Sequence, residues 1–135
     1  FALPLAKTGK RVLAAETDGA AVAAIQANAR EMGLQTLQAV QTDLTRESLA
    51  ALLAPVRPEA AIVDPPRAGG GRHIAGLAGV DSLSRIVWVS CDVVNSARDM
   101  RPFFEQGWEV TSLKLFDMFP QTWHMDVVVV LDRRR

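Results

Sequence analysis

The sequence contains a single cysteine, Cys91, among 135 residues, and this scarcity limits the chemistry open to the chain. One cysteine cannot form an intramolecular disulfide, and the sequence shows no cysteine–histidine cluster of the kind that binds zinc. We therefore expect no metal site and a reducing, cytoplasmic setting. A lone thiol is often a small buried hydrophobic residue, so the surroundings of Cys91 must decide between packing and reactivity.

Long apolar runs and an excess of one charge are also lacking. Even the wholly apolar run from Val127 to Leu131 is only as long as a strand, whereas a membrane helix needs roughly 20 residues. No signal-peptide pattern opens the chain. The 15 basic residues balance the 15 acidic ones, so net charge gives no bulk attraction to nucleic acid, although a local basic patch is compatible with it.

The chain opens on Phe1-Ala-Leu-Pro-Leu-Ala6, without an initiator methionine. This segment is typical of a helix, whereas an α/β domain usually begins with a strand and its ligand-binding turn. We therefore expect residues 1–135 to be one partial domain, truncated at its N-terminus, from which the first strand is missing.

Short apolar runs alternate with helix-forming segments. Strands are expected over residues 11–16, 37–43, 60–64, 86–90, 109–115 and 125–131, and helices over 20–30, 45–54 and 94–106. Asp18 is a suitable N-cap for the first helix, and Gly33 ends it. The connection between the last two strands is too short for a crossover helix, which predicts an antiparallel pair. The pattern predicts an α/β fold with a mostly parallel sheet, helices on both faces and an antiparallel C-terminal hairpin. Trp88 and Trp108, in or beside strands, are expected in the core.

Three predicted strands in succession end in an acid, namely Glu16, Asp43 and Asp64. A carboxylate at such a position accepts hydrogen bonds from ribose hydroxyls in dinucleotide-binding folds. Each acid alone is equally well explained as a helix N-cap. Three acids at one edge of a sheet favour a cofactor cleft, although their spacing does not identify the cofactor.

The segment Asp64-Pro-Pro-Arg67 is the more specific signal. Its two prolines fix the backbone and remove two amide donors, so the strand exit is rigid, while the loop up to Gly71 is expected to be exposed and mobile. An arginine held there can bind phosphate or carboxylate, and a solvated Arg67 is the alternative. Cys91 also directly follows a strand, where ligands bind in parallel sheets, which favours a nucleophile.

Three motifs then occur in a fixed order. They are Asp64-Pro-Pro-Arg67, Val89-Ser-Cys91 with Ala97-Arg98-Asp99, and Asp117-Met-Phe-Pro120 with His124. With them, the sequence resembles the C-terminal catalytic domain of the S-adenosylmethionine-dependent RNA 5-methyluridine (uracil-C5) methyltransferases. The resemblance covers essentially the whole chain. It implies a Rossmann-like class I methyltransferase fold, S-adenosyl-L-methionine as cofactor, and tRNA or rRNA as partner. The family's glycine-rich first motif would lie before Phe1.

The resemblance also implies residue roles. Glu16 would bind the cofactor's ribose, Asp43 would lie by the adenine, and Asp64 would line the methionine side. Cys91 would be the nucleophile and Asp126 the general base. From their residue types rather than from the resemblance, Arg67, Trp123 and His124 are expected to contact the RNA. A purely structural role for His124 is an equal alternative.

Two positions depart from the family pattern. The base is usually a glutamate, and Asp126 is one methylene shorter, while proton abstraction needs hydrogen-bond reach. The family usually has Ser-Cys-Asn-Pro where this chain has Ser90-Cys91-Asp92-Val93, and Asp92 adds a negative charge that disfavours a neighbouring thiolate.

These departures leave other functions open. One is an RNA- or cofactor-binding module with decayed catalysis. Another is an amino-group methyltransferase, which also uses a Pro-Pro loop but usually follows it with an aromatic residue, where this chain has Arg67. We expect the truncated domain alone to be inactive.

Overall fold

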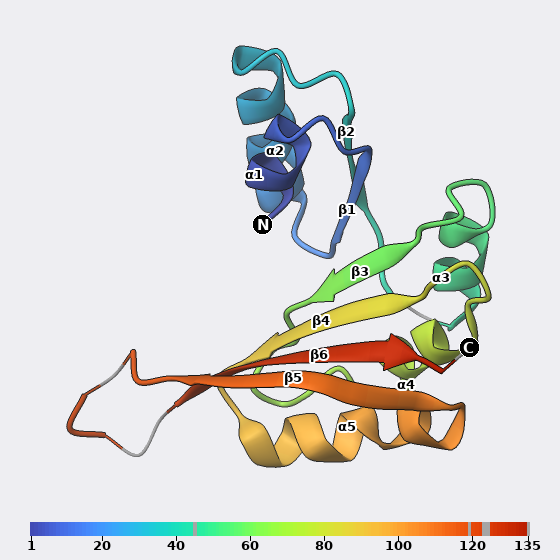
Figure 1. The fold of residues 1–135 in the computed structure, drawn as a ribbon. Helices are drawn as coiled ribbons and strands as arrows, with labels where there is room; N and C mark the ends of the chain where they lie inside the picture. Colours follow the sequence, from blue (N-terminus) through green and yellow to red (C-terminus); the bar gives the residue numbers. More distant parts are fainter. Residues whose placement is uncertain (45, 119, 123–124, 135) are drawn as a thin grey trace. The chain divides into compact units, whose positions relative to one another are not determined.

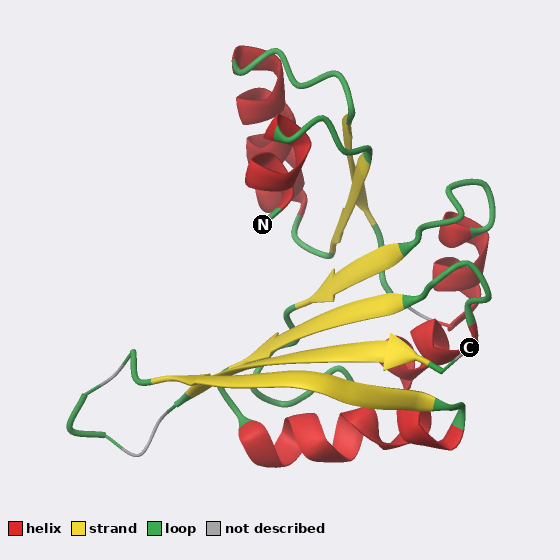
Figure 2. Cartoon of the chain, in the orientation of Figure 1, coloured by secondary structure: helices red, strands yellow, loops and turns green. Residues whose placement is uncertain are grey.

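The computed structural model describes residues 1–44, 46–118, 120–122 and 125–134, without the side chains of residues 46, 47 and 72. The chain divides into two compact units, Phe1–Ser48 and Leu49–Arg135, and each is described by itself. Figure 1 traces the elements in chain order, and Figure 2 separates helices from strands.

The first unit is built on one parallel pair of strands. Its elements are α1 (Ala2–Lys7), β1 (Val12–Glu16), α2 (Gly19–Glu31) and β2 (Leu37–Gln41), and α3 (Arg46–Leu53) runs across the boundary between the units. The strands pair from Val12 with Leu37 to Glu16 with Gln41. The predicted N-cap is confirmed, because the carboxylate of Asp18 accepts a 2.9 Å hydrogen bond from the Ala20 amide.

The second unit contains a four-stranded sheet in the order β3-β4-β6-β5. The strands are β3 (Ala60–Val63), β4 (Arg85–Ser90), β5 (Trp108–Phe116) and β6 (Asp126–Arg133). β3 and β4 are parallel, while β6 runs antiparallel to both β4 and β5. The predicted C-terminal hairpin is therefore confirmed, and its second strand lies between β4 and β5 (Figure 1).

Two helical segments join β3 to β4, and one long helix joins β4 to β5. They are α4 (Gly71–Ala75), the 3₁₀ helix η1 (Gly76–Gly79) and α5 (Val93–Glu105). α5 was expected from the sequence, whereas α4 and η1 were not. Their glycine-rich sequence carries no capping signal, and the residue before α4 makes no side-chain cap hydrogen bond.

The core of the second unit lies between the sheet and α5. Alternate residues of β4 and β6 point into it and are buried: Ile86, Trp88, Ser90, Val127, Val129 and Leu131. The Phe103 ring of α5 meets Trp88 and Trp108 edge to face, with centroids 6.0 and 5.9 Å apart. Both tryptophans are thus core residues, as predicted. Edge-to-face packing of this kind stabilises beyond the buried area alone.

The strands do not form one continuous sheet among the described residues. β1 pairs with β2, and β3 pairs with β4, but none of the described strands pairs with the other edge of β1 or of β3. Parallel pairing is therefore limited to two strand pairs, and the other two pairs are antiparallel. The three acids at strand ends therefore do not follow strands of one sheet. Glu16 and Asp43 belong to the first unit, and Asp64 belongs to the second.

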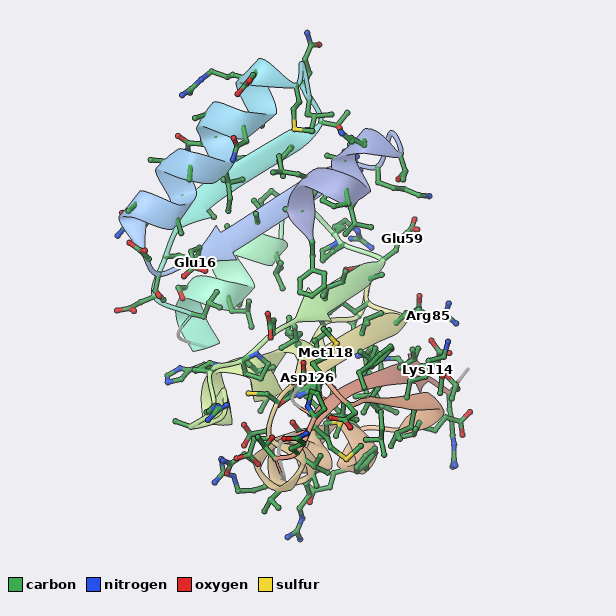
Figure 3. All side chains as sticks on the ribbon, turned by 90° about the vertical axis from the view of Figure 1, so that its left-hand side faces the viewer. Glu16, Glu59, Arg85, Lys114, Met118 and Asp126 are labelled. Carbon is green, nitrogen blue, oxygen red and sulfur yellow. The ribbon has the colours of Figure 1, made fainter. Side chains whose placement is uncertain are left out.

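A cross-strand ion pair fixes the far end of the second sheet. Arg85 and Asp132 are directly opposite each other in the β4–β6 register, and two hydrogen bonds of 2.7 and 2.9 Å join them. Thr111 donates a third bond of 2.7 Å to the same carboxylate. These bonds, chiefly those from Arg85, lower the pKa of Asp132 below its ordinary value of 3.8. By the β4–β6 register, Arg85 and Asp126 are at opposite ends of the sheet; both are labelled in Figure 3.

This ion pair generates a prediction about stability. Because the pKa of Asp132 is lowered in the folded state, its contribution is complete above pH 3.8 and is lost as the pH falls further. We expect Asp132→Asn to destabilise β4 and β6 by about 0.5–1 kcal/mol at pH 7 and by almost nothing near pH 2. Hydrogen exchange of β4 and β6 amides, with Glu105→Gln as control, measures this. An equal loss at both pH values would contradict it.

Candidate active site

The ends of three strands bring the predicted catalytic residues, Cys91 and Asp126, and the predicted cofactor-binding residue Asp64 to one edge of the second sheet. Asp64 directly follows β3, and Cys91 directly follows β4, its parallel neighbour. The last pair between β4 and β6 joins Ser90 to Val127. If this antiparallel register is continued by one step, Cys91 lies opposite Asp126. The thiol and the carboxylate are thus neighbours, although they come from distant parts of the sequence.

The pleat of the strands determines which way these side chains face. Val63, Ser90 and Val127 are all buried, on the face of the sheet that packs against α5. Because side chains alternate along a strand, the residues beside them face the other way. Cys91 and Asp126 are accordingly half-buried, and Asp64 is exposed. Neither Cys91 nor Asp126 is enclosed in the core.

These side chains line one open pocket with a volume of about 300 Å³. Its lining residues are Asp64, Arg67, Val89, Ser90, Cys91 and Asp126. The pocket therefore combines a thiol, two carboxylates and one guanidinium on an apolar strand surface. A nucleophile and a proton acceptor in one pocket are the arrangement that covalent catalysis with proton removal requires.

The backbone around Cys91 is held by its neighbours. The Ser90 hydroxyl accepts a 3.0 Å hydrogen bond from the Asp92 amide and donates one of 3.2 Å to the Asp92 carbonyl. The Asp92 carboxylate accepts a 2.9 Å bond from the Asn95 amide and is the N-cap of α5. Asp92, which departs from the family pattern, thus has a structural role, and the start of a helix is where a negative charge is best tolerated.

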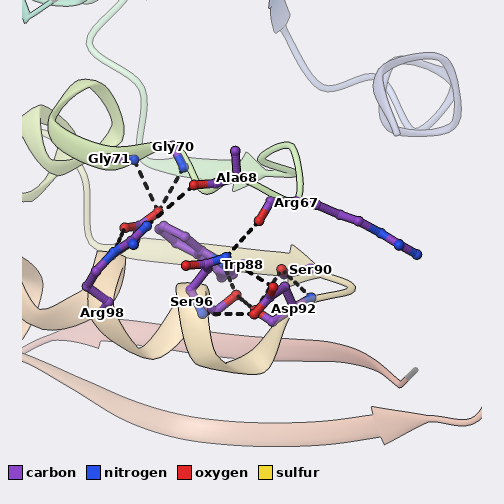
Figure 4. Close-up of polar contacts among 11 residues, drawn as sticks. Arg67, Ala68, Gly70, Gly71, Trp88, Ser90, Asp92, Ser96 and Arg98 are labelled. Atoms are coloured by element: carbon purple, nitrogen blue, oxygen red, sulfur yellow. Dashed lines mark hydrogen bonds and ion pairs between the residues drawn. The ribbon is translucent and has the colours of Figure 1, made fainter. Parts of the chain in front are cut away.

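Arg67 reaches the same pocket from the loop after β3. Its carbonyl accepts a 2.9 Å hydrogen bond from Asn95 Nδ2, while its side chain extends away from α5 and is exposed (Figure 4). The guanidinium is therefore available to a ligand, whereas the backbone beneath it is fixed.

Glu16 and Asp43 lie at the carboxyl end of the strand pair in the first unit. Oε1 of Glu16 accepts bonds of 2.7 and 3.1 Å from the amides of Thr17 and Asp18, and one of 3.2 Å from the Thr17 hydroxyl. The two backbone bonds, with Asp18 first, lower the pKa of Glu16 below its ordinary value of 4.5. Oε2 accepts no hydrogen bond from the residues that the structure describes, which leaves an ionised oxygen for a ligand. The Asp43 side chain is exposed.

Some predicted site residues are not described, and some described ones were not predicted. Trp123 and His124 lie outside the described residues. Ser90 was predicted only as part of the motif Val89-Ser-Cys91, and Asn95 was not predicted, although Asp92 is a suitable N-cap for the helix that begins there. Asp99 enters the sequence prediction only as part of the motif Ala97-Arg98-Asp99.

A wider hollow in the first unit lies at the other end of β2. Its volume is about 590 Å³, and α2 and the start of β2 line it, with Arg30 as the one ionisable residue in the lining. It contains no nucleophile or carboxylate and suggests no chemistry. Among the described residues, no group of three His, Cys, Asp or Glu is placed to bind a metal, and no helix is long and apolar enough to span a membrane.

Sequence comparisons agree with these features. The family described as tRNA (Uracil-5-)-methyltransferase matches residues 1–134. An uncharacterized RNA methyltransferase of Bifidobacterium longum is 33% identical over 138 residues, which cover 98% of this chain and 31% of that protein. The 23S rRNA (uracil(1939)-C(5))-methyltransferase RlmD of Shewanella sediminis is 35% identical over 133 residues, with coverage of 98% and 29%. The chain thus spans about a third of the length of these relatives.

Solved structures share the fold. The tRNA (uracil-54, C5)-methyltransferase of Pyrococcus abyssi, in complex with S-adenosyl-L-homocysteine, has a TM-score of 0.75 at 24% identity and covers 94% of this chain and 30% of its own. A putative tRNA (m1A22) methyltransferase of Streptococcus pneumoniae has a TM-score of 0.74 at 15% identity, with coverage of 99% and 60%. The expected Rossmann-like methyltransferase fold is confirmed. By its match over residues 1–134, the chain belongs to the tRNA (uracil-5-)-methyltransferase family.

Proposed function

We propose that the chain is the catalytic domain of an enzyme that transfers a methyl group from S-adenosyl-L-methionine to C5 of a uridine in tRNA or rRNA. The observation that carries the proposal is that Cys91 and Asp126 line one pocket, although 35 positions separate them in sequence. The names of the relatives support the same reaction. Since the chain spans only part of those relatives, the experiments below use the full-length protein.

Cys91 supplies the activation that the reaction requires. C5 of uracil is a weak nucleophile, and the Cys91 thiolate overcomes this by adding to C6. As the S–C6 bond forms, the C5=C6 electron pair moves to C5, which can then take a methyl group. Because Cys91 directly follows a central strand and its backbone is fixed by Ser90 and Asp92, little freedom remains to be lost on reaction.

Asp126 completes the reaction by removing the proton from C5. The electron pair of the C5–H bond then restores the C5=C6 double bond, the S–C6 bond breaks, and Cys91 leaves as a thiolate. Asp126 is the first residue of β6, so its position follows from the β4–β6 pairing. A shorter carboxylate serves as a base here if the strand itself brings it within hydrogen-bond reach of C5.

The residues present fit the cofactor by their chemistry. In the first unit, Glu16 offers an ionised oxygen to the ribose hydroxyls, and the exposed Asp43 is proposed for the adenine. In the second unit, Asp64 lines the pocket of Cys91 and is proposed for the methionine side of the cofactor. When bound, S-adenosylmethionine supplies an electrophilic methyl group.

RNA binding would involve the exposed side of the pocket. The target uridine must leave its stack, because its reactive edge is inaccessible inside a helix. Arg67 is exposed at the pocket and suits a phosphate. Trp123 and His124 are proposed to contact the base.

A second candidate is a binding module with decayed catalysis. The shorter carboxylate of Asp126 is the observation in its favour, since it is a departure from the family at the base itself. The amino-group methyltransferase is less well supported, because such an enzyme has no use for a thiol in its pocket. The predictions below separate these functions.

The covalent step is tested with RNA containing 5-fluorouridine, whose fluorine blocks proton removal from C5. We expect a stable protein–RNA adduct at Cys91 when the cofactor is present, and none with Cys91→Ser. Denaturing gel electrophoresis and peptide mass spectrometry detect it. Val94→Ala, at an exposed site of α5, is the matched control and should leave the adduct unchanged. Absence of an adduct with both tRNA and rRNA would favour the binding module.

The base is tested by Asp126→Asn. Without a proton acceptor, turnover should fall about 10²- to 10⁴-fold. An adduct carrying the methyl group should accumulate on ordinary uridine, because addition and methyl transfer precede proton removal. Asp126→Glu restores the family's residue and should retain activity. Turnover of Asp126→Asn equal to that of the wild type would contradict the assignment.

The role of Glu16 is tested through cofactor affinity. We expect Glu16→Gln to weaken S-adenosylmethionine binding about tenfold, as measured by calorimetry, because a charged acceptor of the ribose hydroxyls is lost. Since the pKa of Glu16 is lowered below 4.5, the carboxylate stays ionised at every pH above that value. The difference from the wild type should therefore be constant between pH 8 and pH 5. Glu31→Gln is the control, and a difference that disappears near pH 6 would refute this role.

A further inference from the structure

One face of α5 holds the loop that carries Arg67. Asn95, Arg98 and Asp99 occupy positions i, i+3 and i+4 of the helix, and all three side chains bond to the loop backbone. Asn95 Nδ2 donates to the Arg67 carbonyl at 2.9 Å, and Arg98 Nη2 donates to the Ala68 carbonyl at 3.4 Å. Figure 4 shows these bonds reaching from the helix to successive residues of the loop.

Asp99 is the buried member of these three side chains. It is only 5% exposed, and its Oδ2 accepts bonds of 2.8 and 3.1 Å from the amides of Gly70 and Gly71. Oδ1 accepts a 3.0 Å bond from Arg98. A buried carboxylate is tolerated only when such donors satisfy it, so the loop and Asp99 depend on each other.

Gly69 allows the loop to approach this closely. Its φ is +87°, a conformation that side chains rarely adopt, and a Cβ atom there would lie 2.4 Å from Asp99 Oδ2. The loop therefore fits against the carboxylate because this position lacks a side chain.

Asn95 connects this loop to the segment of Cys91. Its Nδ2 group also donates a 3.0 Å bond to Oδ2 of Asp92, the N-cap that follows Cys91. A single amide group thus touches both the backbone of Arg67 and the turn after the thiol. Two hydrogen bonds of one amide group therefore join the two segments.

We infer that Asn95 and Asp99 are positioning residues that place the Arg67 guanidinium for RNA beside the Cys91 thiol. This inference rests on the proposed function and concerns the same pocket. The two residues do not contact the substrate. They act by fixing the loop backbone before binding, so that the ordering cost is not incurred when the RNA binds.

The test compares Asn95→Ala and Asp99→Asn with Arg67→Ala in the full-length protein, using a uridine-containing single-stranded RNA. Removal of a phosphate contact should reduce the slope of log affinity against log salt by about 0.7. We expect Arg67→Ala to show this reduction. Asn95→Ala and Asp99→Asn should each show part of it, with unchanged cofactor affinity. When Asn95→Ala or Asp99→Asn is added to Arg67→Ala, RNA binding should weaken by less than about twofold further. Glu105→Gln, which breaks the exposed Arg101–Glu105 pair of the same helix, should have no effect.

Amide hydrogen exchange of Gly70 and Gly71 gives a readout that does not depend on function. Exchange should accelerate in Asp99→Asn and stay unchanged in Glu105→Gln. Unchanged exchange in Asp99→Asn would overturn the inference, as would additive effects of Asp99→Asn and Arg67→Ala on RNA binding. Should Asp99→Asn fail to fold, Asn95→Ala alone carries the comparison. If Arg67→Ala leaves the salt slope unchanged while the Cys91 adduct still forms, the positioning role is wrong and the proposed reaction stands. If no adduct forms, the reaction itself fails.

Discussion

The pairing of β6 between β4 and β5 is the constraint on which the candidate site depends. It sets Ser90 opposite Val127, so the residues one step outside this pair are Cys91 and Asp126. The same pairing buries alternate residues against α5 and turns the thiol and the carboxylate toward the other face. A slip of β6 by one residue would turn its side chains to the opposite face and remove Asp126 from the pocket of Cys91. The same strand register is therefore required both for the packing of the core and for the geometry of the site.

Much of this arrangement was accessible from the sequence. The six strands, the Asp18 cap, the terminal hairpin and the core positions of Trp88 and Trp108 follow from local patterns and are confirmed, although the strand ends differ from the predicted ones by up to two residues. Convergence of Cys91 with Asp126 was inferred through the family resemblance, because strand order is a tertiary property. The segment with α4 and η1 escaped prediction, since contacts with α5 hold a glycine-rich stretch that has no helical signal of its own.

Asp92 shows why a departure from a family pattern should be interpreted within its local structure. In the sequence it is a negative charge beside the thiol that is proposed as the nucleophile. In the structure its carboxylate accepts hydrogen bonds from the amide and the side chain of Asn95 at the start of α5. The charge is thereby compensated by the helix that follows, and the same hydrogen bonds tie the Cys91 turn to the Arg67 loop.

The way the loop is held has a consequence for how such a domain diversifies. The backbone of residues 67–71 is anchored through its amides and carbonyls, while the Arg67 side chain takes no part in the anchoring. The side chain at position 67 can thus vary without disturbing the strands beneath, whereas Gly69 cannot, because a Cβ atom there would clash with Asp99. A change of ligand chemistry at this loop can therefore act through position 67, whereas the positions of Cys91 and Asp126 depend on the β4–β6 register and on the core beneath it.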